Sequence, residues 1–319
     1  MANEPLITLE NIKVHFPQAQ GFQRAFLRAV DGVSLDIFAG ETVGLVGESG
    51  CGKSTLGRAV TGLLPTTDGK ILYHGKDVNS LKKADKIRFR KNVQMVFQDP
   101  AASLNPRLKV RQIVMEPLLK NVDMTKAEKE TLVAQMVETV GLPADALDRY
   151  PHEFSGGQQQ RIGIARSLVL KPEFIVCDEA VSALDVSVQA QILNLLDELR
   201  EKYTLTYLFI SHNLSVVKHM CDRIAVMYLG RIVELGTAEQ IFGNPLHPYT
   251  RALISAIPVA GKKRQDDRIV LTGDLPAPTE VIAGCAFHNR CYECGERCDK
   301  ECPALREVEP GHFVSCLYV

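Results

Sequence analysis

From residue 5 to about residue 250, short apolar runs alternate with amphipathic stretches. Four stretches carry apolar positions at three- and four-residue spacing, which predicts helices at residues 53–61, 126–140, 157–170 and 187–202. The apolar runs predict buried strands at residues 42–46, 93–97, 174–177, 207–210 and 224–228. This alternation predicts an α/β fold around a mostly parallel sheet.

Two further features set the organisation of the chain. Residues 6–9, 33–37 and 70–73 resemble antiparallel strands joined by turns. Beyond residue 250 the composition changes, and the polar stretch 261–268 (GKKRQDDR) predicts a linker that leads into a cysteine-rich tail. We therefore expect one large domain at residues 1–257 and a small C-terminal extension at residues 258–319.

Composition narrows the class of protein. The 319 residues include 37 basic and 38 acidic side chains, so no global charge favours nucleic acid as a partner. The first residues do not resemble an export signal, and no apolar run approaches the roughly 20 residues that span a bilayer, so a cytosolic location is expected. Six of the nine cysteines lie at residues 285–316, which favours metal or redox chemistry over disulfides.

Residues 47–54 read GESGCGKS between a predicted strand and a predicted helix. Glycines let backbone amides converge on a phosphate chain, Lys53 would reach the β- and γ-phosphates, and Ser54 would bind Mg2+. A chance glycine turn is the alternative. The candidate ATP-binding residues here are Gly47, Glu48, Ser49, Gly50, Cys51, Gly52, Lys53, Ser54 and Thr55.

Two downstream segments would complete such a site. The strand at 174–177 is followed by Asp178 and Glu179, which suit a water-mediated Mg2+ ligand and a carboxylate that orients the attacking water. A buried strand ending in a solvated acidic turn is the alternative. Residues 154–158 read FSGGQ before a helical run, so Ser155 can cap the helix while the two glycines expose its first amides. The phosphate-recognising residues of this segment would be Ser155, Gly156, Gly157 and Gln158.

With these motifs in this order, the chain resembles the nucleotide-binding subunit of an ABC transporter, whose signature motif has the form SGGQ. The resemblance covers roughly the first 250 residues and implies an antiparallel β subdomain and a helical signature subdomain. It also implies a head-to-tail dimer, because the signature of one subunit completes the phosphate loop of another. Ala180 and Asn213 stand where the family usually has proline and aspartate, and neither change removes a catalytic group.

The resemblance assigns roles to four further residues. Gln98 matches the Q-loop glutamine that senses the metal and the attacking water, and Asp185 belongs to the D-loop. His212 matches the switch histidine that contacts the γ-phosphate, and Phe16 is the candidate aromatic for stacking on adenine. The respective alternatives are a surface glutamine, a helix cap, a satisfied histidine at a strand end and a core phenylalanine.

Residues 97–107 (FQDPAASLNPR), residues 247–258 (HPYTRALISAIP) and the tail resemble the peptide and nickel importer group, with dipeptide and oligopeptide importer ATPases the most similar. That resemblance implies a second ATPase subunit, commonly a different chain, and two transmembrane permease subunits. It also implies an extracytoplasmic peptide-binding protein and a peripheral location on the cytoplasmic face of the plasma membrane. Residues 98–107 would receive a helix of the membrane subunit. A nickel or glutathione importer subunit and a soluble phosphonate-type ABC ATPase are the alternatives.

The tail cysteines match the four-cysteine pattern of those importer ATPases at Cys285, Cys291, Cys298 and Cys316. The resemblance implies a [4Fe-4S] cluster, and zinc is the alternative because four thiolates can hold either. Cys294 and Cys302 lie in the same region, so the ligand set stays open. We expect the other three cysteines to be buried in the core: Cys51, Cys177 and Cys221.

Overall fold

The computed structural model describes residues 4–20, 23–257, 268–273, 276, 279–280 and 282–319. They form two compact units. Unit 1 consists of Tyr73–Ile210, Phe38–Glu41 and the first described residues, and unit 2 consists of Ile7–Ile37, Thr42–Leu72 and Ser211–Val319. The predicted linker lies outside the described residues, apart from Arg268.

Unit 1 contains three parallel strands in the order β8-β7-β6. β6 (Val93–Val96), β7 (Phe174–Asp178) and β8 (Thr206–Ile210) consist mostly of buried apolar residues, as expected for strands covered on both faces. Each was predicted within one residue at either end. The carboxyl end of β7 brings Asp178 and Glu179 to the edge of the sheet.

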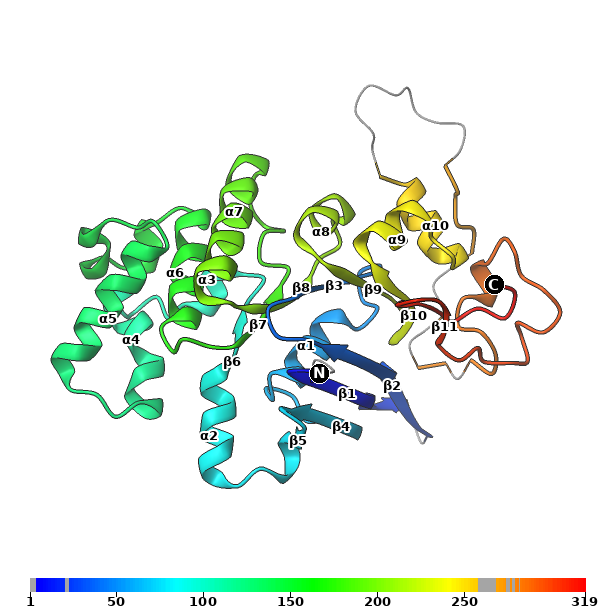
Figure 1. The fold of residues 1–319 in the computed structure, drawn as a ribbon, viewed down its shortest axis with the longest axis horizontal. Coiled ribbons are helices and arrows are strands. Elements are labelled where there is room, and N and C mark those ends of the chain that lie inside the picture. The colour runs from blue at the N-terminus through cyan, green and yellow to red at the C-terminus, as the bar shows by residue number, and fades with distance from the viewer. Residues whose placement is uncertain (1–3, 21–22, 258–267, 274–275, 277–278, 281) are drawn as a thin grey trace. The chain divides into compact units, whose positions relative to one another are not determined.

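Helices α4, α5 and α6 pack on one another in unit 1 (Figure 1) and form the expected helical subdomain. α5 and α6 begin at side-chain caps, because Thr125 pairs with Glu128 and Ser155 pairs with Gln158 in reciprocal capping boxes. The helices of unit 1 are α2 (Lys83–Asn92), α3 (Pro100–Ser103), α4 (Val110–Asn121), α5 (Lys126–Thr139), α6 (Gly156–Leu168) and α7 (Val186–Tyr203). Its short elements are β5 (Lys76–Asp77), η1 (Val78–Ser80), η2 (Ala144–Asp148) and η3 (Pro151–Glu153).

Unit 2 contains a sheet in the order β3-β9-β10-β12-β11. β3 (Thr42–Val46) pairs in parallel with β9 (Arg223–Tyr228), which pairs antiparallel with β10 (Arg231–Thr237). The cysteine-rich tail adds β12 (His312–Val314) beside β10, and then β11 (Arg306–Glu309). The tail therefore extends the same sheet that contains the strand before the phosphate loop.

The expected antiparallel subdomain is also part of unit 2. β1 (Ile7–Gln20) pairs along its length with β2 (Gln23–Ile37), and β4 (Asp68–Tyr73) lies on the other side of β1 (Figure 1). The helices of this unit are α1 (Lys53–Val60), α8 (Leu214–Met220), α9 (Ala238–Gly243), α10 (Pro248–Ser255) and the 3-10 turn η4 (His288–Arg290).

Sequence patterning did not predict α2, α3, α4, α8, α9 or α10. α4 contains Pro117, which is disfavoured in a helix interior. α8 and α9 have only seven and six residues, too few to display a helical period. Among the residues described, no helix has the length and apolar character needed to cross a bilayer.

Candidate nucleotide and cysteine sites

The loop between β3 and α1 has a conformation that requires glycine. Gly47, Gly50 and Gly52 have φ values of 156°, 80° and 105°, which side-chain-bearing residues rarely adopt. A Cβ atom at Gly47 would also clash with the carbonyl oxygen of Met227, and one at Gly52 would clash with that of Ala29. The backbone angle therefore favours glycine at all three positions, and close packing also requires it at Gly47 and Gly52.

α1 begins at Gly52 without a side-chain cap. The helix dipole places partial positive charge at this end of α1. Lys53 is 4% exposed, and its Nζ donates to the carbonyl oxygens of Gly47 at 2.9 Å and Glu48 at 2.8 Å. An ammonium group held inside the loop, next to a helix start that no side chain caps, is a geometry suited to polyphosphate.

Two residues far along the sequence hold Glu48 in place. The Glu48 N–H donates to the Tyr249 hydroxyl at 2.9 Å. The Glu48 carboxylate accepts from Arg290 Nη1 at 2.7 Å and Nη2 at 3.1 Å, a two-pronged ion pair. Sequence reasoning missed both partners of Glu48, because neither Tyr249 nor Arg290 belongs to a nucleotide motif. The only signal in the sequence was that Arg290 lies next to Cys291, a predicted cluster ligand.

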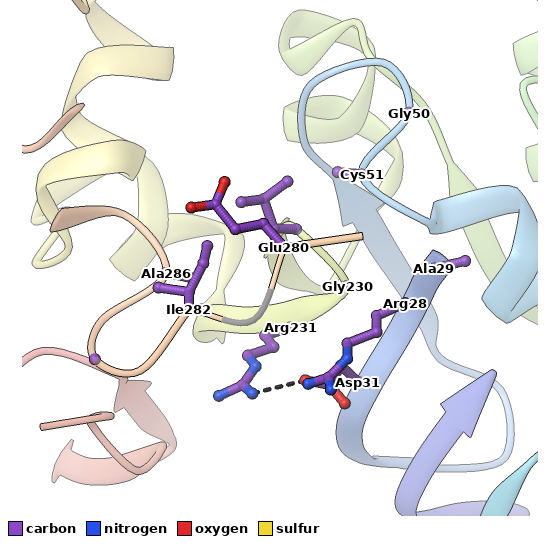
Figure 2. Close-up of a pocket in the computed structure, with 12 residues that line it drawn as sticks. Arg28, Ala29, Asp31, Gly50, Cys51, Gly230, Arg231, Glu280, Ile282 and Ala286 are labelled. Atoms are coloured by element: carbon purple, nitrogen blue, oxygen red, sulfur yellow. Dashed lines mark hydrogen bonds and ion pairs between the residues drawn. The ribbon is translucent and has the colours of Figure 1, made fainter. Parts of the chain in front are cut away.

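One pocket adjoins the phosphate loop within unit 2 (Figure 2). Gly50 and Cys51 line it from the loop, and Arg28 lines it from β2. Arg231 also lines it, and its Nη2 forms a 2.6 Å ion pair with Asp31, drawn as the dashed line in Figure 2. Asp31 also lies 3.1 Å from the Nε2 atom of His15, and these two partners lower the pKa of Asp31 against the raising effect of burial.

In unit 1, Gln98 and Glu179 lie together. Gln98 Nε2 donates to Glu179 Oε2 at 2.8 Å. Asp178 is 1% exposed at the end of β7, and Glu179 follows it with a φ of 45°, an unusual angle for a residue other than glycine. Its N–H donates to the Ile210 carbonyl oxygen at 3.0 Å. This turn places two acidic residues at the carboxyl end of β7, where the Gln98 side chain meets Glu179.

The SGGQ segment forms the start of α6. Ser155 Oγ accepts from the Gln158 N–H at 3.4 Å, and the Gln158 side chain accepts from the Ser155 N–H at 3.0 Å. A Cβ at Gly157 would clash with Val188, so only glycine fits at this contact. Ser155, Gly156 and Gln158 are exposed, which leaves this helix end accessible to a ligand. Asp185 caps α7 by accepting from the Val188 N–H at 3.0 Å.

The two remaining nucleotide candidates belong to unit 2. Phe16 is half-buried in β1 opposite Leu27 and is not part of the fully buried core. His212 is exposed just before α8, where Asn213 caps the helix by accepting from the Ser215 N–H at 3.1 Å. The asparagine found in place of the family's aspartate therefore serves as a helix cap.

Four tail cysteines surround one pocket in unit 2. Cys285, Cys291, Cys298 and Cys316 line it together with Phe287 and Tyr318, while Cys294 and Cys302 are exposed and do not line it. Burial raises the pKa of the Cys285 and Cys291 thiols to about 11 each. Among the described residues, no group of three or more His, Cys, Asp or Glu side chains has the geometry of a metal site. The structure buries the three remaining cysteines as expected: Cys51, Cys177 and Cys221.

Comparison with known proteins identifies the class. Residues 30–182 match the family described as ABC transporter, and residues 233–298 match the oligopeptide/dipeptide transporter C-terminal region. The ATP-binding cassette MJ0796, solved as a dimer, has 28% identity and a TM-score of 0.65 over 73% of this chain and 98% of its own. CbiO1 of Clostridium perfringens, part of an ABC transporter complex, has 26% identity and a TM-score of 0.65 over 76% and 92%.

Two relatives match almost the whole chain. The oligopeptide transport ATP-binding protein AppF of Bacillus subtilis is 51% identical over 98% of this chain and 97% of its own length. The oligopeptide transport ATP-binding protein OppF of Escherichia coli is 48% identical over 98% and 96%. This chain therefore belongs to the ABC transporter ATP-binding proteins that carry the oligopeptide/dipeptide transporter C-terminal region. It is an ATPase, and ATP and Mg2+ are its expected ligands.

Proposed function

We propose that this chain is the ATP-hydrolysing subunit of a membrane importer of dipeptides or oligopeptides. The observation that carries the proposal is the match of nearly the full chain, tail included, to oligopeptide transport ATP-binding proteins at about half identity. The matched tail argues against the phosphonate-type alternative. The names of the relatives favour peptide over nickel or glutathione as the transported substrate.

In unit 2, Lys53 would contact the β- and γ-phosphates, Ser54 would bind Mg2+, and the amides of residues 47–55 would surround the phosphate chain. This assignment is supported by the buried ammonium and the uncapped start of α1. Phe16 would stack on adenine, and His212 would contact the γ-phosphate. A half-buried aromatic and an exposed histidine are compatible with these roles.

In unit 1, Glu179 would orient and deprotonate the attacking water while Asp178 holds Mg2+ through water. The hydrogen bond from Gln98 fixes the Glu179 carboxylate, which supports its assignment as the base. Gln98 also lies at the start of residues 98–107, the proposed docking surface for the membrane subunit. One side chain would thus connect that surface to the hydrolytic carboxylate.

The SGGQ segment would complete the phosphate loop of a second ATPase subunit in a head-to-tail dimer. Its support is the exposure of Ser155, Gly156 and Gln158 at the start of α6, where the helix dipole favours an anion. Asp185 would lie at the same interface. The second subunit, which relatives commonly supply as a different chain, would pair with this one beneath two permease subunits on the cytoplasmic face of the plasma membrane. An extracytoplasmic binding protein would deliver the peptide.

The tail would hold a [4Fe-4S] cluster through Cys285, Cys291, Cys298 and Cys316. Support comes from the pocket that these four thiols share, since thiolates are the ligands such clusters use. A bound cluster would supply four iron–sulfur bonds that fix the tail. Zinc remains the alternative for the same thiol set.

Affinity purification of the tagged full-length chain from source membranes tests the transport assignment. We expect two membrane proteins to co-purify with the wild type and also with Lys53→Ala, because docking at residues 98–107 does not require the phosphate loop. Recovery of a soluble chain without membrane proteins, in both cases, would favour the soluble ATPase alternative.

A further inference from the structure

The tail segment that carries two of the pocket-lining cysteines is packed against the phosphate loop. η4 lies between Cys285 and Cys291 and ends at Arg290. Phe287, just before η4, is 1% exposed, and its ring lies 5.2 Å from that of Tyr228 and 5.4 Å from that of Tyr249. Edge and tilted contacts at these distances stabilise aromatic clusters.

This cluster leads directly to Glu48. The Tyr249 hydroxyl accepts a hydrogen bond from the Glu48 N–H, and two nitrogen atoms of Arg290 donate hydrogen bonds to the Glu48 carboxylate. The Arg290 side chain is 9% exposed and that of Glu48 is 25% exposed, so the pair is screened far less than a surface ion pair. The guanidinium also lies over the Tyr228 ring, 5.9 Å from its centroid.

The tail and the phosphate loop also line one pocket together. In the pocket of Figure 2, Glu280, Ile282 and Ala286 of the tail occupy the side opposite Gly50 and Cys51 of the loop. The tail thus flanks the phosphate loop both near its start and near its middle. Within the tail, the Cys285 N–H donates to the Cys298 carbonyl oxygen at 2.7 Å, which anchors the segment that carries Arg290.

We propose that Arg290 is a positioning residue of the phosphate loop, through which the cysteine-rich tail sets the affinity for nucleotide. The inference rests on the proposed assignment of residues 47–54 as the ATP phosphate loop. Arg290 neutralises a carboxylate located inside an anion-binding loop and holds that loop in one conformation. Removal of the guanidinium leaves the Glu48 charge uncompensated close to the triphosphate and frees the loop, and both effects weaken binding.

The test is calorimetric titration of the full-length chain with MgATPγS. Arg290→Gln is expected to raise the Kd about tenfold, which corresponds to about 1.4 kcal/mol, with unchanged stoichiometry. The double variant Glu48→Gln/Arg290→Gln also removes the uncompensated carboxylate charge but does not restore the bridge that holds the loop, so its Kd is expected to lie between those of the wild type and Arg290→Gln. Arg297→Gln is the matched control, since Arg297 forms an ion pair with Glu301 in the same tail at 2.6 Å, away from the loop.

The outcomes separate this inference from the site it depends on. If Lys53→Ala abolishes binding and Arg290→Gln leaves the Kd unchanged, the positioning role is wrong and the loop assignment stands. If Lys53→Ala binds like the wild type, the loop assignment itself fails. A merely structural role for Arg290 would lower the stoichiometry of Arg290→Gln at unchanged Kd, and that result also overturns the proposal. Arg290→Lys keeps the positive charge and loses the two-pronged geometry, so its Kd is expected to rise about threefold, and an unchanged Kd for this variant contradicts the proposal.

Discussion

Ser155 combines two roles that substitutions can separate. Its hydroxyl caps α6, and the same hydroxyl is proposed to bind the γ-phosphate of an ATP held by a partner subunit. Ser155→Ala removes both, with an expected loss of about 1 kcal/mol in the free energy of unfolding. For a domain of 150 to 250 residues this lowers Tm by about 2–4 °C. Hydrolysis should fall by about a hundredfold, the cost of removing one preorganised donor.

Two further variants isolate each role. Thr125→Ala breaks the equivalent capping box at the start of α5, so it should lower Tm by a similar amount and leave hydrolysis unchanged. Ser155→Asp keeps a good cap but places a negative charge beside the phosphate, so Tm should hold while hydrolysis is lost. Calorimetry and phosphate release by the assembled ATPase measure the two quantities. Full hydrolysis by Ser155→Asp would refute the phosphate-binding role.

Glu179→Gln should retain bound ATP and lower its cleavage by at least about a hundredfold, since it removes the base; an unchanged rate, measured by phosphate release, would exclude Glu179 from that role. Cys298→Ser should abolish the broad visible absorbance of anaerobically purified protein and Cys302→Ser should not, whereas stoichiometric zinc without iron in the wild type would contradict the cluster. Burial lowers the pKa of His247 from its ordinary value of 6.5 to about 3. Between these two pH values the histidine gains a proton in the unfolded chain but not in the folded one. The free energy of unfolding should therefore fall by about 1.4 kcal/mol for each unit by which the pH is lowered in this range. Thermal unfolding of His247→Asn, which preserves a capping side chain, should depend less on pH between 5 and 6.5, and an unaltered slope would contradict this reasoning.

The sequence was sufficient to predict strands and helix caps, which are local features of the chain. Apolar runs located the parallel strands, and side-chain chemistry correctly placed Ser155 as the cap of its helix. Asp185, expected in the D-loop with a helix cap as the alternative, does cap α7. These features depend on neighbours within a few residues, which is why a single sequence contains enough information to predict them.

Contacts between residues far apart in the chain could not be predicted from the sequence. Glu48 and Arg290 are 242 residues apart, and nothing in either segment indicates its partner. The sequence predicted a small C-terminal extension, but it did not indicate that a strand of this tail, β12, pairs with β10, where Glu234 lies opposite Val314. Cysteine spacing likewise left the ligand set open, and only the folded tail separates the four pocket-lining thiols from the two exposed ones. Such features depend on how the chain folds back on itself.

The most direct test of the central claim is ATP hydrolysis by the complete complex, reconstituted in liposomes with its permeases and second ATPase. We predict that hydrolysis rises when the binding protein is added loaded with peptide, and that Glu179→Gln abolishes the rise. Stimulation by Ni2+ or glutathione and none by peptide would contradict the account.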